Sequence, residues 1–379
     1  SSTMKVMIAA ARLKAQGLDV VDLGAGEPDF NTPENVKQAA RRAIDRNFTR
    51  YTAATGVPEL KDAIVERYRR DFGVERGRDE VVATVGGKQS IFNLLLALVD
   101  PGDEVIIPAP YWVTFPQVVR LCGGIPVIAK SAPERGFEVT AELVGRHLNR
   151  RTKVVILNSP CNPTGAVIPW EEFLRICALA AEAGAYVLSD ECYQRFLYDG
   201  LAPYSAAAVP AELRARVVVS GSLSKTYAMT GWRIGYTIAT AELAAAVGKI
   251  QGHETSNPTS IAQAAAIEAL TGPQEPVAEM VREYARRRDY LVPALGALPG
   301  IRCHKPRGAF YVFPDISAWL GAGLETSDEF CARLLEAECV AVTPGSGFGS
   351  EGFIRISYAA SGRALEEGVR RLGEFLGSL

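Results

Sequence analysis

The feature that most constrains the fold is a repeated alternation of short apolar runs with helix-like segments. The strand-like runs are Val81–Val85, Glu104–Pro108, Val154–Leu157, Tyr186–Ser189, Val217–Ser220 and Gly235–Ala239. Helix-like segments lie between or after them at Gln89–Val99, Trp170–Ala183 and Ile261–Leu270. Alternation of buried strands with helices is typical of α/β proteins. We therefore predict an α/β fold with a mainly parallel sheet flanked by helices on both faces.

The last third of the chain has a different pattern. A charged helix-like segment at Val277–Leu291 is followed by three alternating runs, at Gly308–Phe313, Val340–Val342 and Phe353–Ser357. Such alternation is typical of strands with one buried and one solvated face. We predict a smaller α+β domain here.

Composition argues against several classes of function. The formal net charge of −2 gives no basic footprint for nucleic acid and no polybasic patch for a membrane surface. The longest nearly unbroken apolar run, Ile91–Val99, is far too short to span a bilayer. The three histidines lack metal-ligand spacing, which argues against a zinc enzyme. We expect no nucleic-acid partner, no membrane partner and no metal site.

The cysteines and the first residues bear on localisation. Seven cysteines without a CxxC pair favour a reducing compartment, so we predict a cytoplasmic protein. Ser1–Gln16 contains scattered basic residues and no apolar secretory region. Because the sequence starts with serine rather than methionine, we expect further residues before Ser1.

The segment from Val217 to Gly235 gives the strongest indication of chemistry. Hydroxyl side chains follow the run Val217–Val219, then Lys225 and, eight positions later, Arg233. Ligands of open α/β sheets bind beyond the carboxyl ends of the strands. Hydroxyls with an arginine suit a phosphate, and a lysine amine can form a Schiff base, so the segment favours pyridoxal phosphate. A nucleotide-binding P-loop is the weaker interpretation, because Ser224 stands where that motif needs its second glycine.

Two further loops follow predicted strands. Gly86, Gly87 and Lys88 open a helix, where glycines let backbone N–H groups approach an anion. The loop Asn158–Gly165 contains two prolines and a glycine, so it could hold one polar side chain still over a ligand. An ordinary turn and an ordinary surface loop remain alternatives for these two segments.

Three other positions have a functional and a structural interpretation. Asp190 ends a predicted strand, where it could cap a helix or pair with the pyridinium nitrogen of the cofactor. Trp112 could cover the pyridine ring or pack in the core. Arg355 lies between Ile354 and Ile356, so period-2 alternation sets its side chain on the face opposite to theirs. On that face it could point to solvent or bind a carboxylate.

These motifs together resemble the fold-type I, class I/II aminotransferases. The segment Ser222–Gly235 is similar to their cofactor-lysine segment, and the resemblance extends from Gly24–Phe30 to Phe353–Ser357. It implies a large pyridoxal phosphate domain at residues 32–285, with a seven-stranded, mainly parallel sheet, and a small α+β domain from residues 1–31 and 286–379. It also implies a homodimer in which Tyr51 reaches the cofactor phosphate of the neighbouring subunit.

The resemblance assigns roles to individual residues. The implied catalytic residues are Lys225, Asp190 and Tyr193. The implied cofactor-binding residues are Tyr51, Gly87, Lys88, Trp112, Asn162, Asp190, Tyr193, Ser222, Lys225 and Arg233. The implied substrate-binding residues are Gly26, Lys88, Trp112, Asn162 and Arg355. The chain is most like the aspartate and aspartate/prephenate aminotransferase branch with a Gly-Gly-Lys-Gln loop. There Lys88 would bind the side-chain carboxylate, with Ser1 and Thr3 as weaker candidates.

The expected activity is transamination. The amino group of aspartate or glutamate would pass to a 2-oxo acid, oxaloacetate or 2-oxoglutarate, by a ping-pong mechanism. Aromatic, alanine or kynurenine-type substrates and a C–S lyase activity remain alternatives, because they would use the same cofactor residues. A nicotinamide dehydrogenase is disfavoured, since the sequence contains no G-x-G-x-x-G motif.

Overall fold

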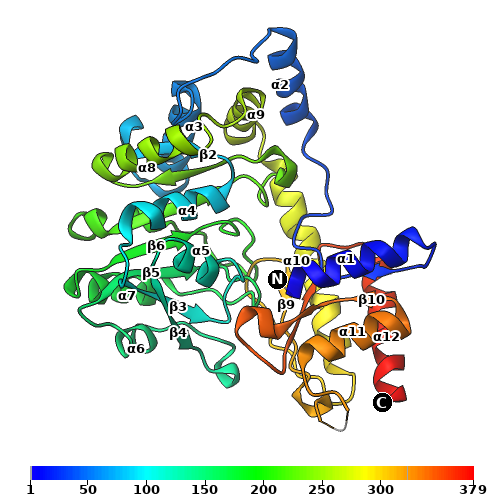
Figure 1. Ribbon diagram of the computed structural model, residues 1–379. Coiled ribbons are helices and arrows are strands. Elements are labelled where there is room, and N and C mark those ends of the chain that lie inside the picture. The colour runs from blue at the N-terminus through cyan, green and yellow to red at the C-terminus, as the bar shows by residue number, and fades with distance from the viewer. Residues whose placement is uncertain (1, 322) are drawn as a thin grey trace.

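The computed structural model describes residues 2–321 and 323–379 and is built around a seven-stranded sheet (Figure 1). In spatial order its strands are β2 (Val81–Thr84), β8 (Gly235–Ile238), β7 (Val217–Ser222), β6 (Tyr186–Asp190), β5 (Thr152–Asn158), β3 (Glu104–Ala109) and β4 (Ile125–Lys130). Only the two pairs that include β8 are antiparallel. The predicted mainly parallel sheet is confirmed.

The edge strand β4 is the one strand of this sheet that the sequence patterns did not indicate. It contains Pro126, and its side chains are mostly half-buried or exposed. Proline and partial exposure are both typical of an edge strand. A search for continuous buried runs therefore misses it.

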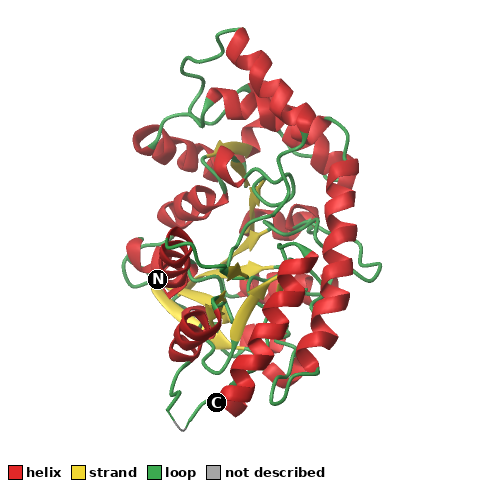
Figure 2. Ribbon diagram, turned by 90° about the vertical axis from the view of Figure 1, so that its right-hand side faces the viewer, coloured by secondary structure: helices red, strands yellow, loops and turns green. Residues whose placement is uncertain are grey.

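Successive residues of the central strands belong to two different cores. Val154 and Ile156 pack with α4, α5 and α8, whereas Val155 and Leu157 pack with helices on the opposite face. The helices of this region are α2 (Glu34–Asp45), α3 (Pro58–Phe72), α4 (Gly87–Leu98), α5 (Phe115–Leu121), α6 (Ala141–Gly145), α7 (Trp170–Glu182), α8 (Ala241–Glu254) and α9 (Ser260–Thr271). Figure 2 shows helices on both sides of the strands.

The two ends of the chain meet in a second region. The N-terminal strand β1 (Val21–Asp22) pairs in parallel with β10 (Val340–Ala341), and α1 (Ser2–Ala15) lies against the C-terminal elements (Figure 1). The remaining elements here are β9 (Tyr311–Val312), β11 (Thr343–Pro344), β12 (Ile354–Ser357), α11 (Ser327–Glu338) and α12 (Gly362–Ser378). The long helix α10 (Glu275–Gly296) runs through position 285, so the division at 32 and 285 stays a prediction.

The strands of this second region differ from the expected pattern. They form a three-stranded sheet in the order β11-β12-β9, and every residue of β12 is buried. The predicted solvated face is wrong for β12, because Arg355 is only 3% exposed. Alternation of side chains distinguishes two faces, but it does not tell a face that lines a cavity from one that meets water.

Among residues 2–321 and 323–379, no helix combines the length and the apolar character that a membrane span requires.

Candidate active site

A cavity of about 400 Å³ lies at the carboxyl ends of the central parallel strands. The register sets Asn158 of β5 beside Asp190 of β6, and Asp190 beside Ser220 of β7. This is the edge where open α/β sheets bind ligands. The predicted site residues that line the cavity are Gly26, Gly87, Lys88, Trp112, Asn162, Asp190, Tyr193, Ser222, Lys225, Arg233 and Arg355.

One end of the cavity is an anion cradle at the start of α4. Gly86 has a φ of +81°, and a Cβ there would lie 2.5 Å from Nη2 of Arg233. A Cβ on Gly87 would lie 3.2 Å from the Cβ of Ser222. The glycines therefore let a helix N-terminus, a hydroxyl and a guanidinium converge. This donor set fits a phosphate group.

The lysine on the loop after β7 points into the cavity. Nζ of Lys225 donates a hydrogen bond of 2.6 Å to the carbonyl oxygen of Gly26. Burial is the main cause that lowers the pKa of Lys225, and the cations of Arg355 and Arg233 act in the same direction. A lowered pKa favours the neutral amine, which is the form that attacks an aldehyde and accepts a proton.

Backbone strain marks the loop that holds this lysine. Ala228 and Arg233 adopt φ values of +50° and +54°, a region that costs a non-glycine residue of order 1 kcal/mol or more. Thr32 holds the loop by donating a hydrogen bond of 2.6 Å to the carbonyl oxygen of Ala228, and Trp232 donates to Thr32. The surrounding structure thus fixes the direction of both Lys225 and Arg233.

A buried carboxyl group faces the lysine from β6. Asp190 is 5% exposed, and its Oδ1 accepts a hydrogen bond of 3.1 Å from the backbone N–H of Cys192. Burial raises the pKa of Asp190 to about 7, against the opposing effects of that hydrogen bond and of Lys225. A cation held next to Asp190 would stabilise its charged form, so the position fits a pyridinium nitrogen.

At the other end of the cavity lies a buried arginine without a carboxylate partner among the described residues. Nη1 of Arg355 donates to Oδ1 of Asn162 at 3.0 Å, and Nη2 donates to the carbonyl oxygen of Gly24 at 2.8 Å. The guanidinium lies against the rings of Tyr311 and Phe348. Within the described chain, Nε has no hydrogen-bond partner. A buried guanidinium left in this state is suited to a ligand carboxylate.

A second cation lies near the mouth of the cavity. Nζ of Lys88 is 5.1 Å from the centre of the Trp112 ring, and no carboxylate of the described residues pairs with it. Desolvation lowers the pKa of Lys88, and so does the charge of Arg233. The site therefore contains two separated positions for anionic groups besides the cradle at α4.

Two predicted features lie outside this arrangement. Tyr51 is 91% exposed and does not line the cavity of its own chain. Ser1 and the side chain of Thr3 fall outside the described residues.

The structure also brings in residues that the sequence patterns did not single out. Tyr311 lines the cavity, and so do Glu27 and Thr230, which are joined by a hydrogen bond of 2.8 Å. Tyr311 lies in the run Gly308–Phe313, where its apolar neighbours make it resemble a core aromatic residue. The regular alternation of a strand was the only signal that could have indicated it.

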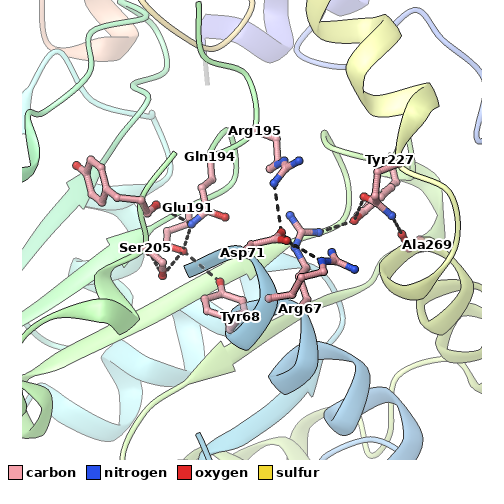
Figure 3. Close-up of polar contacts among 12 residues, drawn as sticks. Arg67, Tyr68, Asp71, Glu191, Gln194, Arg195, Ser205, Tyr227 and Ala269 are labelled. Carbon is pink, nitrogen blue, oxygen red and sulfur yellow. Dashed lines mark hydrogen bonds and ion pairs between the residues drawn. The ribbon is translucent and has the colours of Figure 1, made fainter. Parts of the chain in front are cut away.

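A second polar cluster surrounds Glu191 (Figure 3). Glu191 is the residue after Asp190, and its carboxylate accepts hydrogen bonds from Tyr68, Gln194, Ser205 and the backbone of Ala206. We call these five residues the Glu191 cluster. Beside it, Arg67 donates to Tyr227, two residues beyond Lys225. Asp71 pairs with both Arg67 and Arg195.

Among the described residues there is no group of three or more His, Cys, Asp or Glu side chains that could hold a metal ion.

Known proteins resemble this chain over nearly its whole length. The family model described as aminotransferase class I and II matches residues 18–372. An aspartate aminotransferase of Bacillus sp. strain YM-2 is 44% identical over 99% of this chain and 96% of its own. An aspartate/prephenate aminotransferase of Cereibacter sphaeroides is 45% identical over 100% of this chain and 96% of its own. The solved structure of Thermus thermophilus aspartate aminotransferase with maleate has a TM-score of 0.93 and 42% identity, over 99% of this chain and 96% of its own.

Proposed function

Because the chain belongs to the class I and II aminotransferases, we propose that it is a pyridoxal 5′-phosphate-dependent aspartate aminotransferase. It moves the amino group of aspartate or glutamate to oxaloacetate or 2-oxoglutarate by ping-pong half-reactions. The observation that carries the proposal is the cavity in which Lys225, Asp190 and Arg355 meet, because Arg355 has no carboxylate partner among the described residues. The relatives do not favour the alternatives of aromatic, alanine or kynurenine-type substrates or of C–S lyase activity.

When bound, the cofactor supplies an aldehyde that joins to amines and a pyridine ring that accepts electrons. Gly87, Ser222 and Arg233 would hold its phosphate, with Lys88 close by at the start of α4. Asp190 would hold the pyridinium nitrogen, Trp112 would cover the ring, and Asn162 and Tyr193 would bond the 3′-oxygen. The polar groups that line the cavity are of the kinds that these contacts require.

Lys225 is the proposed point of Schiff-base attachment and the proposed proton carrier. Its Nζ is held at the carbonyl of Gly26, and its lowered pKa favours the free amine. When its amine is free, Nζ would accept the proton that leaves the substrate Cα atom. Lys225 would thus serve first as a nucleophile and then as a general base.

Substrate orientation is assigned to the opposite end of the cavity. Arg355 would bind the α-carboxylate with Asn162, and the backbone of Gly26 lies beside the same guanidinium. Lys88 would bind the side-chain carboxylate of the dicarboxylic substrate, since it is a cation that lacks an acidic partner within the described chain. Two cations that line the same cavity as Lys225 suit a substrate with two carboxylates.

The active unit is proposed to be a homodimer in which Tyr51 completes the cofactor site of the neighbouring subunit. The 91% exposure of Tyr51 in the single chain is consistent with this, because its side chain is free to contact a second chain. Mixing Tyr51→Phe subunits with Lys225→Ala subunits should restore part of the activity, since one site of each hybrid would be unchanged. If mixing restores no activity, each chain holds its own complete site.

The proposed compartment is the cytoplasm. All seven cysteines are free, which is typical of proteins in a reducing environment.

Activity assays test the function directly. The loaded protein should convert aspartate and 2-oxoglutarate to oxaloacetate and glutamate, and it should do so faster than it uses alanine, phenylalanine or kynurenine. Chromatography of all products separates transamination from a lyase. Release of ammonia or sulfide without a new amino acid would contradict the proposal.

A further inference from the structure

Tyr311 connects two groups of the site that are otherwise separate. It is fully buried on β9, and its Oη lies 2.8 Å from Oη of Tyr193. Cζ of Arg355 lies 4.5 Å from the centre of the Tyr311 ring. A Cβ on Gly26 would lie 3.4 Å from Oη of Tyr311, so the hydroxyl also borders the segment that accepts from Lys225.

The direction of the hydrogen bond between the two tyrosines follows from counting protons. A phenol hydroxyl has a single proton to donate. Either residue can be the donor in the chain alone. When Tyr193 donates its proton to the 3′-oxygen of the cofactor, it can only accept from Tyr311. Tyr311 then becomes the donor to Tyr193. Because the Tyr193 hydroxyl accepts this hydrogen bond, it becomes a stronger donor to the 3′-oxygen.

The charge of Arg355 acts on this pair. Burial raises the pKa of Tyr311 to about 12, and Arg355 opposes that rise by favouring the release of the phenol proton. A carboxylate bound to Arg355 would cancel part of this charge, so Tyr311 would donate less strongly to Tyr193.

From this geometry we propose that Tyr311 is a positioning residue that couples occupancy of the Arg355 carboxylate site to the hydrogen bond between Tyr193 and the cofactor. The inference rests on the proposed function, because it takes the cofactor to lie at Tyr193 and the substrate carboxylate at Arg355. Tyr311 touches neither reacting atom and acts through its hydroxyl.

Other titratable or charged groups face the pair and share its environment. Cys192 lies beside Tyr193 on the loop after β6, and Asp190 ends that strand. Arg355 faces the pair from β12, and Lys225 lines the same cavity from the loop after β7. None of these side chains changes when the Tyr311 hydroxyl is removed, so they form a constant background for a substitution there.

The test is a spectrophotometric pH titration of the cofactor bound to the full chain. Tyr311→Phe keeps the ring against Arg355 and removes only the hydroxyl. A donor to the 3′-oxygen lowers the proton affinity of the neighbouring imine, so weakening that donor should raise the pKa of the chromophore. We expect a rise of about 0.5 unit or more, because a neutral hydrogen bond commonly changes an affinity several-fold. Succinate has two carboxylates and no amine. The shift that saturating succinate causes in the pKa of the chromophore should be at least twofold smaller in Tyr311→Phe than in the wild type.

Two further variants make the result specific. Tyr358→Phe also removes a fully buried hydroxyl, one that bonds the carbonyl oxygen of Ala309 at 3.1 Å outside the cavity, and its titration should match the wild type. Tyr193→Phe with Tyr311→Phe should titrate like Tyr193→Phe alone, because Tyr311 acts through Tyr193.

The outcomes separate this inference from the proposed function. Additive shifts in the double variant, or a Tyr311→Phe titration equal to wild type with and without succinate, would overturn the coupling. In both cases the wild type would still transaminate aspartate. A wild-type protein that binds no cofactor would instead overturn the proposed function.

Discussion

Two buried polar clusters meet at the end of β6. They differ in whether the protein itself supplies all their hydrogen-bond partners. Asp190 and Glu191 are consecutive and almost equally buried, and burial raises the pKa of each to about 7. Glu191 accepts hydrogen bonds from side chains and backbone of the Glu191 cluster (Figure 3). Asp190 accepts from one backbone N–H and otherwise faces the cavity. A saturated cluster needs no ligand, whereas an incomplete one is suited to a ligand.

The buried arginines repeat this contrast. Arg67 is 5% exposed and has Asp71 and Tyr227 as partners, whereas Arg355 is 3% exposed and has only neutral partners within the described chain. Burying a charge without a counter-charge is costly. The counter-charge at Arg355 is therefore expected from a substrate, so the comparison assigns stability to one cluster and activity to the other.

The largest expected effect is on turnover at the incomplete cluster. Lys225→Ala should lower kcat roughly 10⁴-fold or more, because it removes a nucleophile and a proton carrier together, and general base catalysis alone contributes about 10²–10⁴-fold. Thermal unfolding of the variant should resemble that of the wild type. Borohydride reduction of the wild type followed by peptide mapping should place the label on Lys225, and a label on any other lysine would contradict this assignment.

The next effect is on stability and belongs to the Glu191 cluster. Glu191→Ala should lower the free energy of unfolding by about 3 kcal/mol, because Tyr68, Gln194 and Ser205 would lose a shared acceptor inside the protein. Denaturant titration of the chain without cofactor measures this loss. Arg355→Leu serves as the matched control, since it removes a buried charged group that lacks a counter-charge and should cost less stability. A smaller loss for Glu191→Ala than for Arg355→Leu would break the comparison.

A third test uses the pH dependence of stability. Folding raises the pKa of Asp190 from 3.8 to about 7. The native state therefore holds a proton that the unfolded chain has released, and stability falls as pH rises from about 4 to about 7. Asp190→Asn stays neutral, so without cofactor it should lose less unfolding free energy than the wild type between pH 5 and pH 8, by about 2 kcal/mol. Equal losses in the two proteins would show that Asp190 does not carry this dependence.

The sequence indicated most of the cavity because its residues end strands or begin helices. Asn162, Asp190, Ser222 and Lys225 lie at or just beyond the carboxyl ends of parallel strands, which meet at one edge of a sheet. Their convergence follows from the predicted alternation of strands and helices, without knowledge of any loop conformation.

The remaining features could not be obtained in that way. Glu191 follows Asp190 in the chain, and only the surrounding side chains show that its carboxylate belongs to a saturated cluster rather than to the cavity. Tyr311 is surrounded by apolar residues and resembles a core side chain until its hydroxyl is seen beside Tyr193. The predicted role of Tyr51 depends on a second chain, so a single chain shows only its exposure.

The smallest expected effect concerns substrate choice at Lys88, an exposed cation that lines the cavity. Its position near Trp112, without an acidic partner in the described chain, favours a role in binding the second carboxylate of aspartate. A cation at a helix N-terminus also opposes the helix dipole by about 0.3–1 kcal/mol. An anion held nearby would offset that cost, and either the cofactor phosphate or the substrate could supply it.

Lys88→Met separates the two sources of that anion, because it keeps the apolar stem against Trp112 and removes only the charge. If the substrate carboxylate is the partner, kcat/KM for aspartate should fall about tenfold, or about 1.4 kcal/mol, while kcat/KM for alanine should stay nearly constant. Lys88→Arg should recover part of the loss, since it restores a cation of similar reach. An equal fall for aspartate and alanine, together with weaker cofactor binding, would assign Lys88 to the phosphate alone. The second anion position of the cavity would then have no substrate partner, and the preference for dicarboxylic substrates would need a different explanation.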